Sequence, residues 1–189
     1  MVLPVYAYGN TVLREEGEEL NPDYPGLQQF IDDMFETMYD SNGVGLAAQQ
    51  VGKAIKLFIV DASPFAEDEG YEHLADFKKV FINPQIVEED GDEWAFNEGC
   101  LSFPDLRFDV DRNERIRIKY LDRDFKPHDE VYDGISARII QHEYDHVKGV
   151  LFIDRISGLK RKMLTKRLNL ITKGMVKASY KMKFPKVKR

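Results

Sequence analysis

Hydrophobic residues recur at every third or fourth position over residues 27–38, LQQFIDDMFETM. This period predicts an amphipathic helix that buries one face. Residues 135–148 predict a second helix, ended by Gly149, a residue type that tolerates the left-handed backbone of a helix end. Residues 158–173 predict a last helix whose outer face is basic.

Shorter apolar stretches predict strands. Residues 56–62 and 80–89 are rich in β-branched and aromatic residues, and the first of these stretches is apolar enough to be largely buried. Residues 106–110 and 115–122 alternate apolar and polar side chains, and residues 112–113 between them predict a turn. The acidic stretch 63–78 predicts a surface excursion. This order of elements indicates an α+β fold, in which mixed or antiparallel strands pack around a central helix, with N-terminal and C-terminal helices.

The bulk composition is that of an ordinary soluble protein. The chain has 189 residues, of which 43% are hydrophobic and 32% charged, and its single cysteine excludes an internal disulfide. No apolar run approaches the roughly 18 residues that a membrane span needs, and the start lacks the basic-then-hydrophobic pattern of a secretory signal. We therefore expect a cytoplasmic protein without a membrane segment, with residues 1–157 as a single domain and residues 158–189 as a basic helix and tail.

The charge is unevenly distributed. Residues 155–189 contain thirteen Lys or Arg and no Asp or Glu, whereas residues 1–154 contain fourteen basic and thirty-three acidic residues, a balance of −19. A solvated helix face with a basic tail accounts for this pattern. The alternative is a surface that meets nucleic acid, such as that of the ribosome, because clustered Lys and Arg bind phosphate without sequence preference.

The segment QHEYDH, residues 141–146, contains the candidate chemistry. His142 and His146 are four residues apart, so a helix places both imidazoles on one face, where a single metal ion could take both. Glu143 between them suits a general base. Two core histidines bonded to backbone carbonyls are the structural alternative, but burying them with a carboxylate is costly without a purpose.

Few residues could be a third ligand. His73 and His128 both lie in loop-like surroundings, and the segment that follows His146 offers only Asp154. Cys100 is the remaining candidate: Gly99 allows close backbone approach, and one thiolate with two imidazoles leaves an open fourth position. Cys100 could instead be a small buried hydrophobe, or a nucleophile with a histidine base, which would leave Glu143 without a role. The metal is the preferred interpretation.

Three segments together resemble the peptide deformylase family: GVGLAAQQ at residues 43–50, EGCLS at residues 98–102 and QHEYDH. They occur in the family's order, and the resemblance spans residues 4 to 156, because PVYAYGNTVLR is also similar to the family's amino-terminal segment. The excursion at 63–78 is longer than in many members, and the C-terminal basic region is variable in the family.

The resemblance implies an enzyme that removes the N-formyl group from N-formylmethionyl nascent polypeptides and releases formate. It implies that Cys100, His142 and His146 hold the metal and that Glu143 carries the proton. Amide hydrolysis also needs donors where the formyl oxygen gains charge. By resemblance these donors are the side-chain amide of Gln50, selected over Gln49 by its spacing from the glycines, and the backbone N–H of Leu101.

Substrate contacts are expected on two sides. The backbone of Val44 and Gly45 would pair with the peptide as an added strand, a mode that reads main chain. Ile135 and Ile139 would line a slot for the methionine side chain. The aliphatic part of Arg138 would pack beside them, and its guanidinium is expected to reach solvent. Glu98 and Arg107 resemble a charged pair at the rim of the family's cleft, next to Gly99.

The ligand types do not select the metal. A thiolate with two imidazoles accepts Fe(II), Zn(II), Ni(II) or Co(II); the resemblance implies one divalent ion, Fe(II). Two other functions use part of the pattern. A zinc endopeptidase would share the histidines and Glu143 but would leave EGCLS and GVGLAAQQ unexplained. A non-catalytic binder of N-termini is disfavoured because Glu143, Gln50 and Cys100 are all present.

Overall fold

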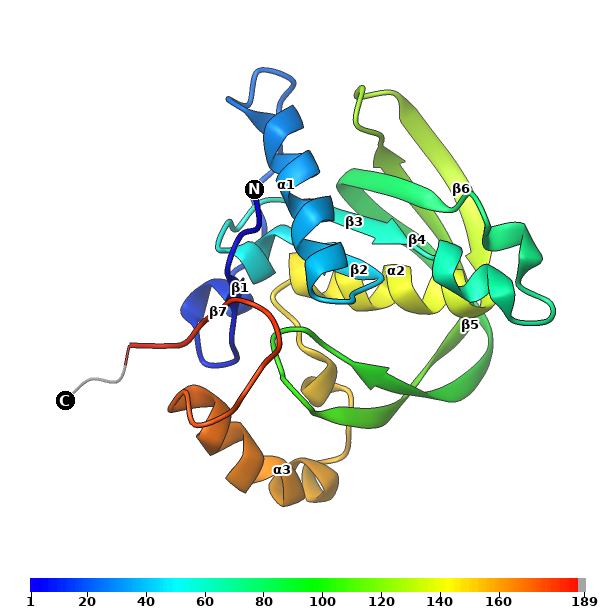
Figure 1. Ribbon diagram of the computed structural model, residues 1–189. Helices are drawn as coiled ribbons and strands as arrows, with labels where there is room; N and C mark the ends of the chain where they lie inside the picture. Colours follow the sequence, from blue (N-terminus) through cyan, green and yellow to red (C-terminus); the bar gives the residue numbers. More distant parts are fainter. Residues whose placement is uncertain (187–189) are drawn as a thin grey trace.

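A five-stranded antiparallel sheet forms the centre of the molecule in the computed structural model, which describes residues 1–186 (Figure 1). Its strand order is β2-β3-β4-β5-β6, and the strands are β2 (Gly45–Ala47), β3 (Leu57–Asp61), β4 (Lys78–Gly99), β5 (Arg107–Leu121) and β6 (Pro127–Asp133). The helices are α1 (Leu27–Asp40), α2 (Gly134–Val147) and α3 (Gly158–Thr172). The predicted α+β class is confirmed.

Two helices cover the two faces of the sheet. Strand β3 is buried along its whole length because Leu57 and Ile59 pack in the cluster around α1, while Phe58 and Val60 pack in the cluster around α2. The alternation of successive side chains across a strand produces this division. The three predicted helices are confirmed to within two residues at their ends, and α2 occupies the centre of Figure 1.

Strands β4 and β5 form one long ribbon, and here the sequence prediction was wrong. No turn occurs at residues 112–113: β5 is continuous, with Trp94 of β4 opposite Arg112 and Glu93 opposite Asn113. The sequence predicts a turn at the polar pair 112–113 between two alternating stretches, yet the Arg112 side chain is buried within β5. The alternation further along β5 is confirmed, since Ile116, Ile118 and Tyr120 are buried.

The sequence patterns did not predict several short elements. The segment GVGLAAQQVG contains strand β2 and a 3₁₀ helix, and strand β6 covers residues 127–133, where no strand was expected. The excursion at 63–78 is largely exposed or partly buried and contains two 3₁₀ turns. The 3₁₀ elements are Thr11–Arg14, Ala48–Val51, Ser63–Glu67, Glu72–Leu74 and Phe152–Asp154.

The C-terminal region packs against the remainder of the chain. Leu168 and Ile171 of α3 are buried in a third apolar cluster together with Phe103 and Phe152. The chain then returns to the N-terminus, where β7 (Met182–Lys183) pairs in parallel with β1 (Val5–Tyr6), side by side in Figure 1. The division of the chain at residue 157 stays a prediction. Within residues 1–186, no helix is both long and apolar enough to cross a membrane.

Candidate active site

Helix α2 presents His142, Glu143 and His146 inside the molecule, and all three residues are at most 8% exposed. The helix is amphipathic and ends in a turn whose Gly149 has φ +72°. A side chain at Gly149 would lie 2.6 Å from the backbone oxygen of Arg14, so only glycine fits there. The sequence therefore fixes where the histidine-bearing helix stops.

Cys100 completes a cluster with the two histidines. It follows the last residue of β4, and its Sγ lies 3.3 Å from His146 Nε2. One candidate ligand atom from each of Cys100, His142 and His146 lies within 4.8 Å of the others. Ligands about 2.0–2.3 Å from one tetrahedral ion lie about 3.3–3.8 Å apart, so modest contraction of the cluster suits a metal. Burial lowers the pKa of His146, which keeps its imidazole in the neutral form that binds metal.

Glu98 orients His142. One carboxylate oxygen lies 2.9 Å from His142 Nδ1, which leaves the other ring nitrogen, Nε2, available to a metal ion. Burial alone would raise the pKa of Glu98, but hydrogen bonds from His142 and Arg112 outweigh it and hold the pKa well below its usual range. The predicted rim pair of Glu98 with Arg107 is wrong: Glu98 is 4% exposed, and Arg107 instead bonds Asn97.

Arg112 supports the same helix, and sequence reasoning missed it. Its guanidinium donates to Glu98 through Nε at 2.6 Å and Nη2 at 3.0 Å, and to Asp145 of α2 through Nη1 at 2.7 Å. All these groups are buried, so the ion pairs tie the β4–β5 ribbon to α2 in a medium of low dielectric. The alternation of inward and outward side chains at residues 108, 110 and 112 could have indicated that Arg112 faces inward.

Arg138 is buried, contrary to the expectation that its head reaches water. Its side chain is 2% exposed and donates from Nη1 to Glu98 and to the Val110 carbonyl, each at 2.9 Å. The guanidinium also lies over the Trp94 ring, 4.5 Å from the centroid. The snorkelling expectation failed because the ribbon carrying Trp94 closes over this end of α2.

Glu143 lies against the backbone of β2. Its Oε2 is buried without a hydrogen-bond partner in residues 1–186, and burial raises its pKa to about 7. A side chain at Gly45 would lie 2.5 Å from Glu143 Oε1, so glycine is required for this approach. Gln50 holds its own loop by accepting from the Ala47 N–H at 2.9 Å, which turns its amide nitrogen towards Cys100 Sγ, 3.5 Å away.

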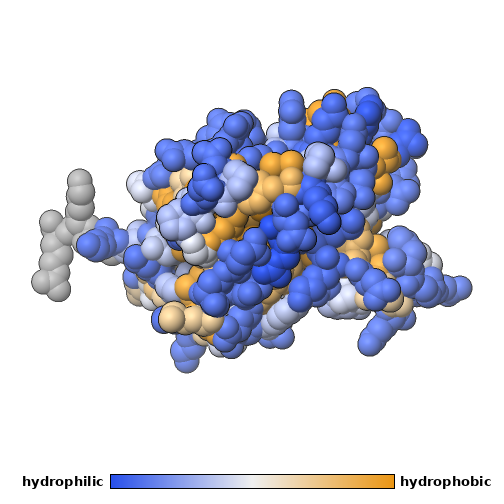
Figure 2. Space-filling view, turned by 90° about the horizontal axis from the view of Figure 1, so that it is seen from above, coloured by the Kyte–Doolittle hydropathy of each residue, from blue (hydrophilic) through white to orange (hydrophobic). Residues whose placement is uncertain are grey.

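Two adjoining cavities open onto these groups. The first, about 340 Å³, is lined by Gly43, Gln50, Cys100, Leu101, Glu143 and Tyr180. The second, about 270 Å³, is lined by both apolar and polar side chains and contains the predicted Ile135 and Ile139. Phe65 of the 63–78 excursion and Phe96 of β4 also line the second cavity and were missed, because nothing in the sequence relates either segment to α2. The face in Figure 2 is mainly hydrophilic with apolar patches between.

The remaining predicted residues divide between the cavities. Val44, Gly99 and Arg107 line both, and Glu98 and Arg138 line the second. Strand β2 is an edge strand; the Val44 carbonyl accepts from Asp61, so alternation turns the peptide groups of Gly45 away from β3. His128 lies elsewhere, 2.8 Å from Asp122, and His73 lies in the 63–78 excursion.

An α+β fold with a Cys-His-His cluster beside a buried glutamate is the arrangement of a metal-dependent hydrolase. The family model for polypeptide deformylase matches residues 2–162. The chain is 48% identical to the peptide deformylase of Christiangramia forsetii over 100% of this chain and 99% of the other. It is 50% identical to that of Flavobacterium johnsoniae, with the same coverage. The chain belongs to the polypeptide deformylase family.

Solved structures agree with this assignment. A peptide deformylase from Legionella pneumophila superposes with a TM-score of 0.79 at 36% identity, covering 93% of this chain and 98% of that chain. A peptide deformylase from Plasmodium falciparum gives a TM-score of 0.79 at 34% identity, covering 90% and 95%. The resemblance inferred from the three motifs is confirmed.

Proposed function

We propose that this chain hydrolyses the formyl group from N-formylmethionyl peptides, with Cys100, His142 and His146 as the metal ligands and Glu143 as the proton carrier. The observation that carries this assignment is the cluster of three candidate ligand atoms beside a buried carboxylate with one unpartnered oxygen, in a chain of the deformylase family. A divalent ion held there would supply an activated water and polarise the formyl carbonyl.

Glu143 carries the proton in this mechanism. Its free Oε2 takes a proton from the attacking water while the water oxygen bonds to the formyl carbon. Glu143 then gives the proton to the amide nitrogen, the carbon–nitrogen bond breaks, and formate and a free amino group leave. Gln50 and the N–H of Leu101 stabilise the oxygen that gains charge, and losing one such donor costs about a hundredfold or more in rate.

The substrate binds along β2 in this proposal. Its backbone pairs with the free edge at Gly45, next to Val44, and this pairing tolerates many sequences after methionine. The methionine side chain enters the cavity lined by Ile135, Ile139 and Phe65. Arg107 lies close to the backbone of Gly99, and only glycine permits this approach, since a Cβ at position 99 would lie 2.7 Å from Arg107 Nη1.

Formate release from a short formyl-methionyl peptide tests the proposal. Protein purified without oxygen is assayed as made, after chelation, and after Fe(II), Zn(II), Ni(II) or Co(II) is restored. We propose Fe(II) as the native metal on the resemblance to the family alone, because the thiolate-imidazole ligand set also accepts Zn(II), Ni(II) and Co(II). Activity should vanish with the metal and return with Fe(II). If no metal restores formate release, the proposed function is wrong.

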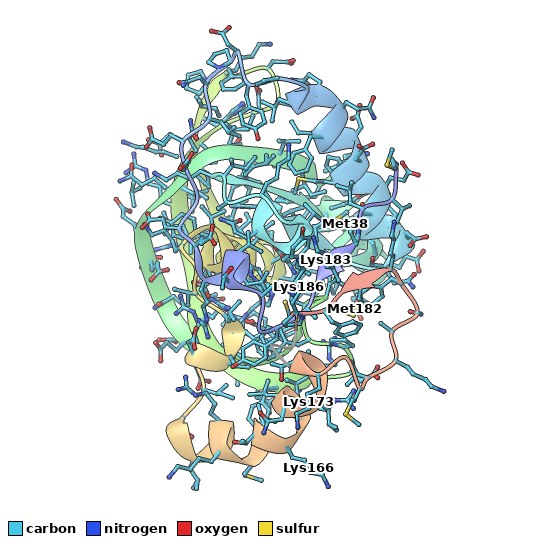
Figure 3. The ribbon with its side chains drawn as sticks, turned by 90° about the vertical axis from the view of Figure 1, so that its left-hand side faces the viewer. Met38, Lys166, Lys173, Met182, Lys183 and Lys186 are labelled. Atoms are coloured by element: carbon cyan, nitrogen blue, oxygen red, sulfur yellow. The ribbon has the colours of Figure 1, made fainter. Side chains whose placement is uncertain are left out.

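We further propose that the exposed lysines of α3, in the basic region 158–189, contact the ribosome surface, where nascent chains emerge in the cytoplasm. Figure 3 shows Lys166 on the outside of the helix, and Lys160 and Lys162 are also exposed. Changing these three lysines to Gln should weaken salt-sensitive binding to purified ribosomes while peptide hydrolysis is retained. The matched control changes three exposed lysines outside α3 to Gln: Lys78, Lys119 and Lys126. Equal binding by both variants would contradict a specific role for α3.

A further inference from the structure

Tyr180 reaches the active-site cavity from the C-terminal segment, far in sequence from the deformylase motifs. Its ring lines the same cavity as Cys100, Gln50 and Glu143. Its hydroxyl donates to the backbone carbonyl of Leu101 at 2.7 Å. The side chain is partly buried, and the family model that matches the chain ends at residue 162, before this segment begins.

The segment around Tyr180 is anchored on the body of the protein. Directly after it, β7 pairs with β1 through the Val5 N–H to the Lys181 carbonyl at 2.8 Å and the Ala7 N–H to the Lys183 carbonyl at 3.0 Å. In Figure 3, Met182 and Lys183 lie above α3, so the chain returns from that helix to the N-terminal strand. Phe184 packs in the third apolar cluster. Tyr180 is therefore presented by a fixed backbone.

The turn that Tyr180 contacts has its carbonyls held one by one. The Cys100 carbonyl accepts from the Phe103 N–H at 2.8 Å, and the Ser102 carbonyl accepts from the Tyr8 N–H at 2.9 Å. Tyr180 holds the carbonyl between them, that of Leu101. The Leu101 N–H itself makes no backbone hydrogen bond within residues 1–186. The turn is thus fixed through its acceptors, while the donor assigned to the oxyanion stays free.

We infer that Tyr180 is a positioning residue for deformylation: through the Leu101 carbonyl it fixes the turn that presents Cys100 and the Leu101 N–H. This inference rests on the proposed roles of Cys100 and Leu101. A donor must point at the place where charge develops, and it is effective only if its direction is set beforehand. The hydrogen bonds to the carbonyls of Cys100, Leu101 and Ser102 supply that constraint.

The test is Tyr180→Phe, which removes one hydroxyl and keeps the ring. Because the partly buried Leu101 carbonyl loses its donor, we expect kcat per bound metal to fall about three- to tenfold. KM should stay within about twofold, since the lost interaction acts mainly in the transition state. Tyr180→Ala, which also removes the cavity wall, should raise KM in addition.

Tyr6→Phe is the matched control. Tyr6 accepts from Lys183 Nζ at 2.8 Å, so this variant also loses one hydroxyl contact to the C-terminal segment, outside the cavity. It should keep wild-type kcat and KM. Metal content and thermal unfolding are measured for each variant.

Three results would overturn the inference. Tyr180→Phe could behave as Tyr6→Phe does. The lower kcat of Tyr180→Phe could return to the wild-type value when it is expressed per bound metal or per folded protein, which would make the role of Tyr180 structural. Finally, wild-type protein could release no formate with any metal, which would remove the proposed function first and the positioning role with it.

Discussion

Gly45→Ala tests how closely the β2 backbone must approach Glu143. The new Cβ would lie 2.5 Å from Glu143 Oε1 and 2.8 Å from its Cδ and Cγ, whereas ordinary contacts begin at 3.4 Å. Glu143 borders the active-site cavity, so its side chain can only relieve the contact by shifting about 1 Å away from β2, off its position in the site. Misplacement of a catalytic group by about 1 Å costs about a hundredfold in rate.

The backbone of Gly45 does not require glycine, since its φ lies outside the left-handed region. Overpacking should therefore cost only about 1–3 kcal/mol of stability. We expect a folded protein whose kcat for formate release falls about a hundredfold. Gly158→Ala is the matched control, because a Cβ there meets nothing within 4 Å and its φ is also unconstrained. A Gly45→Ala enzyme with wild-type kcat would refute the reasoning about Glu143.

Three further predictions follow from other contacts. Glu98→Gln should weaken metal affinity about 10- to 100-fold in a chelator competition, because His142 loses its orienting carboxylate; unchanged affinity would contradict that role. Phe65→Ala should relax the preference for formylmethionine over bulkier formylated residues by about tenfold or more in kcat/KM, and a retained preference would separate Phe65 from the methionine slot. Burial would raise the pKa of Asp154, but hydrogen bonds from Arg14 and the Leu151 N–H outweigh it and hold the pKa below the ordinary 3.8. The carboxylate therefore stabilises the fold above pH 3.8, and this contribution disappears as pH falls through the lowered pKa. Asp154→Asn should accordingly be less stable to unfolding than wild type at neutral pH, and the difference in stability should shrink in acid. A difference in stability that does not change with pH would show that the charge of Asp154 is not its cause.

The sequence contained enough to predict the helices and the cluster of candidate metal ligands. The helical period at 27–38 and the spacing of His142 and His146 are local patterns, so neither depends on how the chain folds back. Cys100 emerged because few other ligands were available. The fold class followed from the order of the elements, and the motifs identified the family.

The contacts that surround the cluster could not be predicted in the same way. Arg112 looked like part of a polar turn because a charged residue in a buried strand position violates the usual alternation unless partners are known. Glu98 and Asp145 supply those partners, and they come from another strand and from α2. Phe65 and Tyr180 reach the cavities through long-range folding of irregular segments, for which the sequence has no periodic signal.

The central claim is tested most directly by the products formed from a formyl-methionyl peptide with wild-type protein and Glu143→Gln. The account predicts equal amounts of formate and of intact peptide bearing a free amino group. Glu143→Gln should lower kcat by about 10²- to 10⁴-fold while retaining bound metal. Glu89→Gln, the same change at an exposed site, should have no effect. Cleavage of an internal peptide bond, or full activity without the Glu143 carboxylate, would contradict the account.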